Sequence, residues 1–261
     1  MKKNTRQGLV PIKIRKGSFL SIIRSTYKEE GLYHLIGTTP KYLFDVCFNR
    51  IPNYLVFLYY SWSKTSETFE FQGTTYRYLF HPYCSTWKNE RCVVIPIAWQ
   101  KVLEYEAQRK NILEIGNMTS YVYKVGHDVL DKYELISGVI NEDIVDFHPT
   151  TKYDFIFSLM TLQYVGWYES PREPMKIVKA MENLRHILAP GGAIMVIHPF
   201  GHNPVMDQLL TNGTLRFDKK FYLKRICGYK WEEADWESVK ETRYDYSVPT
   251  ANGVLIAFIE N

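Results

Sequence analysis

The sequence predicts an α/β fold with a mostly parallel sheet, and three stretches support this prediction. The apolar run at 112–115 is short enough for a buried strand, and it stops at Gly116, which permits a tight turn. A second run, 153–158, has the same character. A helical pattern ending at Leu188 then passes through a Pro-Gly-Gly turn into the apolar run 193–197. Strands that alternate with helices are typical of a parallel sheet.

The bulk composition indicates an ordinary globular chain. With 261 residues, of which 46% are hydrophobic, one large domain with an N-terminal addition is expected. The net charge of +4 does not indicate a nucleic-acid partner, because no basic block lies among aromatic residues as in known readers. The four cysteines lack the paired spacing of a zinc site or a disulfide framework, so we expect no metal and a reducing cytoplasm.

Residues 1–65 form an extension of different character, basic at first and then strongly aromatic. A membrane-spanning helix needs about 20 uninterrupted apolar residues, and polar residues from Asp45 to Asn53 divide this run. Basic and aromatic residues together suit an anionic membrane surface, so residues 1–62 are a candidate contact with the inner face of the membrane. The alternative is that these aromatics pack on the main domain or in a dimer contact. The sequence does not predict the oligomeric state.

Residues 66–110 lead into the core. Alternation of aromatic and polar residues around Gly73 and Thr74 predicts a β-hairpin. Pro96 is expected to open the next helix, because its missing N–H suits the first turn. Arg91 is a candidate partner for a substrate or cofactor carboxylate. The alternative is a surface salt bridge to Glu90.

At residues 111–116 the chain resembles the class I S-adenosylmethionine-dependent methyltransferases, whose first strand reads as hydrophobic residues, an acid, a hydrophobic residue and glycine. The run 153–158 and the Pro-Gly-Gly turn resemble the same family, and the resemblance covers about 111–261. It implies a Rossmann-like, doubly wound, mostly parallel seven-stranded sheet with an antiparallel C-terminal strand. The closing strand pair is expected at 241–246 and 253–259, and 219–229 is expected to be helical. The first crossover is short, so its helix is expected to be truncated or replaced by a loop.

The resemblance also implies S-adenosyl-L-methionine as cofactor and a set of residues that bind it. The turn after the first strand would contribute Glu114, Gly116 and Asn117. Asp131, at the end of the second strand, would accept the ribose hydroxyls; the alternative is a solvated acid. Asp143 would hold the adenine amino group, Ile144 would pack on the ring, and Ser158 would face the methyl-donor cleft.

Catalytic candidates lie in two loops at the same edge. Gln163 and Tyr164 stand where many small-molecule methyltransferases carry an acid and a histidine, so Tyr164 is a candidate. His198 and His202 follow the fifth strand, and either is expected to take a proton from a hydroxyl acceptor, since imidazole titrates near pH 6.5. The alternative for each histidine is a structural hydrogen bond.

These residues predict methyl transfer to a small polar acceptor, for example a sugar hydroxyl or another glycan-related group. A catalytically silent binding or scaffold protein is the alternative, favoured by the replaced glycines after Gly116 and by Gln163 and Tyr164. A nicotinamide-dependent oxidoreductase is less favoured, because the sequence lacks the G-x-G-x-x-G pattern that cradles a pyrophosphate.

Overall fold

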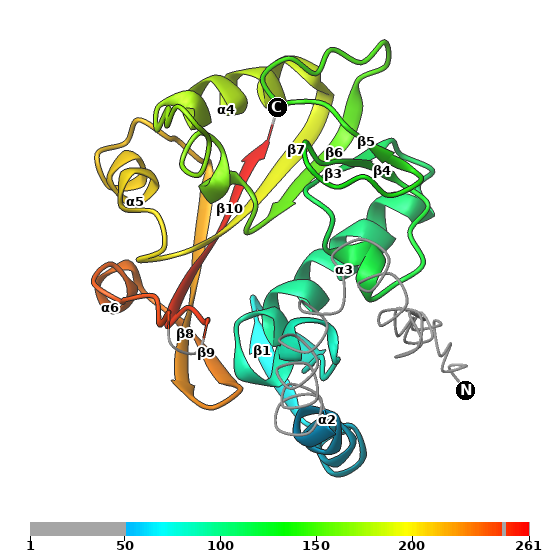
Figure 1. Cartoon of the computed structure of the whole chain (residues 1–261), viewed down its shortest axis with the longest axis vertical. Coiled ribbons are helices and arrows are strands. Elements are labelled where there is room, and N and C mark those ends of the chain that lie inside the picture. The colour runs from blue at the N-terminus through cyan, green and yellow to red at the C-terminus, as the bar shows by residue number, and fades with distance from the viewer. Residues whose placement is uncertain (1–50, 247–248, 261) are drawn as a thin grey trace, which may run out of the picture.

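The computed structural model describes residues 51–246 and 249–260, and its core is an eight-stranded sheet (Figure 1). From one edge to the other the strands are β5 (Val139–Ile140), β4 (Asp128–Leu130), β3 (Ile112–Ile115), β6 (Tyr153–Leu159), β7 (Leu188–Pro199), β10 (Gly253–Glu260), β8 (Lys219–Cys227) and β9 (Lys230–Ala234). The five strands from β5 to β7 are parallel.

The C-terminal strand β10 lies between β7 and β8 and is antiparallel to both, as predicted. The mostly parallel α/β architecture is therefore confirmed. The predicted number of seven strands is wrong for the described residues, because β9 adds an eighth strand, antiparallel to β8, at the edge.

Helices cover both faces of this sheet (Figure 1). On one face lie α3 (Arg91–Ala107) and the hairpin of β1 (Thr68–Phe71) and β2 (Thr74–Arg77). On the other lie α4 (Lys176–Ile187), α5 (Pro204–Thr211) and the short α6 (Trp236–Val239). Side chains alternate between the two cores, so that Ile112 packs on the α3 side and Leu113 and Ile115 pack on the α4 side. This burial on both faces explains why the central strands are apolar runs.

The hairpin and the loop after β3 are as predicted. Gln72 and Gly73 link β1 to β2 with φ angles of 49° and 69°, a pair of positive values that suits a tight two-residue turn. Between β3 and β4 the chain forms only a short 3-10 turn, Thr119–Tyr121, in place of the first crossover helix.

The predicted role of Pro96 is wrong, since α3 begins at Arg91 and Pro96 lies inside it. A proline leaves the carbonyl four residues earlier without its helical donor. Here that carbonyl belongs to Cys92, and it accepts a hydrogen bond from the backbone N–H of Leu79 at 2.9 Å. A tertiary contact thus replaces the missing helical bond and lets the apolar segment before Pro96 become a buried turn of helix.

The predictions for the last third of the chain also need correction. Residues 219–227, expected to be helical, form strand β8, because they pair with β10 on one side and β9 on the other. Residues 241–246, expected to form a strand, contain only an isolated bridge between Asp245 and Thr250.

In the N-terminal extension, Ser18 is expected from the sequence to cap a first helix, and the aromatic run after Pro52 is expected to continue a second. The second is present as α2 (Ile51–Ser63), whereas the first lies outside the described residues. Within the described ranges, no helix is both long enough and apolar enough to cross a bilayer. The proposed domain boundaries at 65/66 and 110/111 stay predictions.

Candidate functional site

A cavity of about 440 Å³ opens at the carboxyl ends of β3, β4 and β6. This is the edge at which ligands bind in open α/β sheets. The loops after β3, β4 and β5 contribute to its wall, among other residues, Asn117, Met118, Asp131, Lys132, Asp143 and Ile144. The other lining residues include Tyr83 from the segment before α3, Arg91 at the start of α3, and Met160, Thr161, Tyr164 and Glu169 from the segment after β6.

Gly116 makes the turn at the end of β3, with φ of +82°, and donates its backbone N–H to the carbonyl of Leu130 at 2.8 Å. A Cβ at this position would overlap the side chain of Thr161, with the Thr161 Cγ2 at 2.8 Å and Cβ at 2.9 Å. Glycine is therefore required both for the positive φ and for the close approach of Thr161, which lines the cavity.

Glu114 is fully buried and is not among the residues that line the cavity. Its Oε1 accepts the backbone N–H groups of Met118 at 2.8 Å and Thr119 at 2.9 Å. Its Oε2 accepts the Thr119 hydroxyl and lies 3.1 Å from Nε2 of His127. The carboxylate thus stabilises the loop that carries Asn117 into the cavity wall.

Asp131 lines the cavity directly after β4. Its Oδ1 accepts the backbone N–H groups of Tyr133 at 2.8 Å and Glu134 at 3.0 Å, so the side chain also shapes the following turn. Oδ2 accepts no hydrogen bond from any residue within 51–246 and 249–260, which leaves one carboxylate oxygen available to a ligand.

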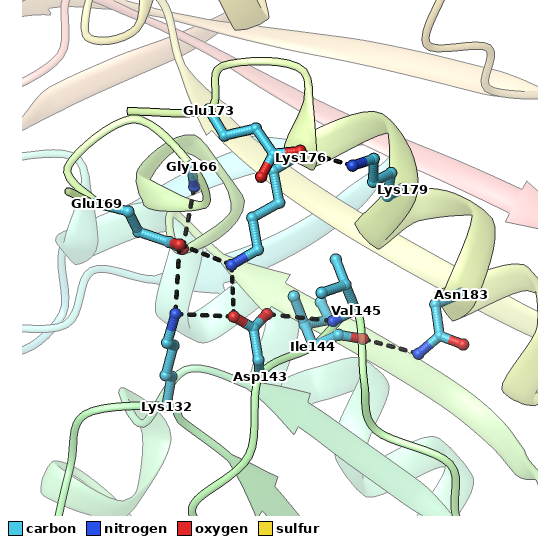
Figure 2. A network of polar contacts seen from close by, with 10 residues as sticks. All are labelled: Lys132, Asp143, Ile144, Val145, Gly166, Glu169, Glu173, Lys176, Lys179 and Asn183. Atoms are coloured by element: carbon cyan, nitrogen blue, oxygen red, sulfur yellow. Dashed lines mark hydrogen bonds and ion pairs between the residues drawn. The ribbon is translucent and has the colours of Figure 1, made fainter. Parts of the chain in front are cut away.

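Asp143 belongs to a ring of four alternating charges, shown in Figure 2. Lys132 lies 2.8 Å from Asp143 and 3.3 Å from Glu169, and Lys176 binds the same two carboxylates, with 2.6 Å to Glu169. The ring ties the loops after β4, β5 and β6 together at one end of the cavity.

The charges in the ring shift one another's pKa values. Burial raises the pKa of Asp143 and of Glu169, but hydrogen bonds from the two lysines, and from the backbone N–H groups of Val145 and Gly166, outweigh burial and hold both pKa values below the usual range. The sequence alone does not indicate Lys132, Glu169 or Lys176 as site residues, because their ion pairs join segments that no local sequence pattern relates.

Of the two predicted cofactor-binding residues Ile144 and Ser158, only Ile144 lines the cavity. Ile144 is buried and lines the cavity, beside Leu130. Ser158 is buried within β6, between Ile115 of β3 and Val196 of β7 in register. Its hydroxyl has no hydrogen-bond partner among the described residues, and Ser158 is not part of the cavity lining.

The two histidines occupy different places. His198 is fully buried in β7, and its Nε2 lies 2.7 Å from Oδ1 of Asp207 on α5. His202 is also buried, but its ring lies 5.1 Å from that of Tyr164, which lines the cavity. Burial lowers the pKa of His202, so its imidazole is neutral at pH values around 7. Of the two, His202 is nearer to the cavity wall.

Arg91 lines the cavity at the first residue of α3. Its guanidinium Nη1 lies 3.3 Å from Oε1 of Glu90, so the predicted salt bridge forms, although Glu90 is buried and the Arg91 side chain is only 17% exposed. Tyr83, beside it, stacks on Tyr121 with ring centroids 4.5 Å apart and planes 4° apart. This stack was not predicted, since the two tyrosines are distant in the sequence.

Within the described ranges, no group of three or more His, Cys, Asp and Glu side chains is placed to hold a metal ion.

No protein-family model matches the chain, and no curated protein matches it. Several solved structures are similar. The N-methyltransferase NodS from Bradyrhizobium japonicum in complex with S-adenosyl-L-homocysteine has 15% identity and a TM-score of 0.39, over 67% of this chain and 94% of that chain. A S-adenosylmethionine-dependent methyltransferase from Clostridium acetobutylicum has 11% identity and a TM-score of 0.34, over 82% and 98%. The sugar N-methyltransferase KedS8 from Streptoalloteichus has 10% identity and a TM-score of 0.32, over 63% and 86%.

Proposed function

We propose that this protein binds S-adenosyl-L-methionine and transfers its methyl group to a small polar acceptor, for example a sugar hydroxyl or another glycan-related group. The observation that carries the proposal is the cavity at the strand ends, where Asn117, next to the Gly116 turn, lines one space with Asp131 and its free Oδ2 and with the apolar Ile144. Such a space combines a close backbone approach, a carboxylate and an apolar surface, which a nucleoside requires.

The residues present fit this cofactor. Asp131 would hold the ribose hydroxyls through Oδ2, and Ile144 with Leu130 would pack against the adenine. Asn117 and Gly116 would lie along the methionyl part. Glu114 would act indirectly by fixing their loop. The Asp143 carboxylate already accepts hydrogen bonds from two lysines and from Val145, so we assign it to the cavity wall; contact with the adenine amino group stays a prediction.

When bound, S-adenosylmethionine would supply an electrophilic methyl carbon: the lone pair of an acceptor atom forms a bond to it, and the electrons of the broken carbon–sulfur bond stay on the departing sulfur. The protein's part is to align the acceptor, and such positioning can contribute about 7 to 11 kcal/mol. A hydroxyl acceptor must also lose its proton. We assign this role to His202, acting beside Tyr164, because its imidazole is neutral and its buried Nδ1 lacks a partner among the described residues. An amine acceptor would not need a general base of this kind.

Calorimetric titration with S-adenosylmethionine and S-adenosylhomocysteine tests the proposal. We expect binding of both ligands and a raised melting temperature with each. If neither ligand releases heat or protects against melting, the methyltransferase proposal fails. Binding without turnover of any acceptor would favour the silent scaffold, which the replaced glycines after Gly116 still support.

We also propose that the N-terminal part contacts an anionic membrane surface. The observation is that α2 exposes large apolar side chains, with Leu55 59%, Tyr59 56% and Trp62 85% exposed, and that the sequence before it is basic. Flotation with anionic vesicles at low salt tests this. Association that is lost in Trp62→Glu supports the proposal, whereas wild-type protein that stays in the soluble fraction assigns these side chains to protein packing.

A further inference from the structure

Arg91 lines the cofactor cavity together with Tyr164, which also belongs to a group of aromatic side chains that we call the tyrosine cluster. The cluster consists of Tyr164, Tyr168, Tyr244 and Tyr246, whose rings surround the imidazole of His202 at centroid distances of 4.8 to 6.1 Å. Tyr164 belongs to both the cavity and the cluster. An acceptor that contacts Tyr164 in this cavity would therefore share the cavity with the Arg91 guanidinium.

The Arg91 guanidinium is fixed but largely unpaired. Its Nη1 contacts Glu90, while its Nε is buried and has no partner among the described residues. Glu90 itself is 1% exposed, and its Oε2 accepts the backbone N–H of Ala251 at 2.9 Å. A guanidinium has five N–H donors. The protein thus holds a planar cation in place with donors left for a carboxylate or phosphate, which Arg binds by two parallel hydrogen bonds.

Most of the acidic residues that line the cavity, including Asp131 and Asp143, lie on the loops after β4 and β5. Glu169, after β6, is paired with Lys132 and Lys176, and Lys132, the one lysine in the lining, is also paired with Asp143. Arg91, at the start of α3, lines the same cavity as Tyr164. Burial raises the pKa of the Tyr164 and Tyr244 phenols, and the positive charge of Arg91 opposes this rise in both.

The tyrosine cluster offers exposed aromatic faces beside this cation. Tyr164, Tyr168 and Tyr246 are 42%, 58% and 61% exposed, although each packs on a neighbouring ring of the cluster. Exposed tyrosines of this kind present an apolar face with a polar tip. The C–H face of a sugar ring can pack on such a surface while its hydroxyls bind water and the phenol groups.

Resting on the methyl-transfer function above, we propose that the acceptor is an anionic sugar, whose carboxylate or phosphate pairs with Arg91 while its ring packs on the tyrosine cluster. Arg91 is then a specificity-determining residue for the acceptor and not a ligand of the cofactor. The two sources of the anion, a uronate and a phosphorylated sugar, share the same recognition chemistry and are separated by experiment.

The test uses the full-length protein saturated with S-adenosylhomocysteine, into which galacturonate, galactose 6-phosphate and galactose are titrated at millimolar concentration. We expect one charged sugar to bind, with about ten- to hundredfold higher affinity than galactose. Arg91→Gln should abolish this preference, and Tyr168→Ala should weaken charged and neutral sugars alike. Arg77→Gln, an exposed arginine on β2, is the matched control.

Separate titration of S-adenosylhomocysteine into each variant distinguishes the two proposals. Unchanged affinity in Arg91→Gln supports an acceptor role, whereas a loss as large as that for the charged sugar assigns Arg91 to the cofactor and overturns the inference. Equal binding of charged and neutral sugars, or no binding of either charged sugar, also overturns it. If wild type binds no S-adenosylhomocysteine, the methyl-transfer proposal itself fails. Arg91→Lys, which keeps the charge beside Glu90 and should lose most of the preference, replaces Arg91→Gln if that variant does not fold.

Discussion

The backbone N–H of Thr119 donates a hydrogen bond to the Glu114 carboxylate across 2.9 Å. Thr119 lies in the short loop that replaces the first crossover helix, as predicted. Replacing Glu114 by Ala leaves the N–H groups of Met118 and Thr119 unpaired in a buried place. We expect a loss of about 1 to 3 kcal/mol in the free energy of unfolding. Thermal melting measures the loss, and amide exchange of residues 117–121 should rise.

The exposed Glu106 on α3 provides the control for this change. If Glu106→Ala and Glu114→Ala melt at the same temperature, the carboxylate does not stabilise the loop.

Gly116 and Thr161 form a second testable pair. Gly116→Ala should weaken S-adenosylhomocysteine binding and lower stability, because the new Cβ overlaps the Thr161 side chain at a φ of +82°. Thr161→Gly removes the overlapping atoms, so the double variant should recover part of both losses. The strain of an L-residue at positive φ, about 1 to 2 kcal/mol, should remain. Additive effects in this double-mutant cycle, followed by calorimetry and melting, would disprove the steric explanation.

Asp131→Asn isolates the charge at the end of β4. The amide keeps an oxygen that can accept from Tyr133 and Glu134, so the turn should persist. The ribose hydroxyls would lose a charged acceptor, which corresponds to about ten- to hundredfold weaker binding of S-adenosylhomocysteine. Asp146→Asn, an exposed acid in the loop after β5, should bind as wild type does. Equal affinities in the two variants would place Asp131 outside the binding site.

The charge ring predicts a specific dependence of stability on pH. The pKa values of Asp143 and Glu169 lie below their unfolded values of about 3.9 and 4.3. Their contribution to stability is therefore fully present above pH of about 4 to 5, and it is lost as the pH falls through the lower folded-state pKa values. Lys176→Met removes a main partner of both carboxylates, so it should lower stability near neutral pH and flatten the acid loss.

Urea unfolding at pH values of about 7, 5 and 3 measures this dependence. Lys179→Met is the matched control, because Lys179 pairs with the exposed Glu173 at the surface, where an ion pair contributes little. A Lys176→Met profile parallel to that of wild type would contradict the linkage.

The two histidines are expected to behave differently once an acceptor is known. His202→Gln should lower turnover of a hydroxyl acceptor by about 10² to 10⁴ and remove the rise of the rate through a pKa below 6.5. His198→Gln should mainly lower the melting temperature, since His198 pairs with Asp207 away from the cavity. The pH–rate profiles of the two variants show which of the two histidines acts as the general base. A rising limb that survives in His202→Gln would return His202 to a structural role.

Local patterns in the sequence were sufficient for the central strands and the hairpin. The Pro-Gly-Gly turn expected before the last parallel strand lies instead inside β7, beside an irregularity in its pairing with β6. The central strands and the hairpin depend on neighbours in the chain: a short apolar run suits a strand covered on both faces, and a glycine with positive φ marks the turn after it. The position of Asp131 and Ile144 at the cavity follows from the same logic, because parallel strands place their carboxyl ends at one edge.

Contacts between distant segments decided the rest. Pro96 lies inside a helix because Leu79 supplies a donor to the Cys92 carbonyl, and Lys219–Cys227 is a strand because β10 and β9 pair with its two edges. The helix and strand propensities of these residues cannot predict either feature, because the hydrogen-bond partners come from distant parts of the chain. Contacts between distant segments also determine the site. The buried Glu114 carboxylate binds the backbone of the loop after β3, and Ser158 is enclosed between β3 and β7. Only the tertiary structure determines which polar side chains meet buried partners and which face the cavity, because burial depends on all the elements packed around them.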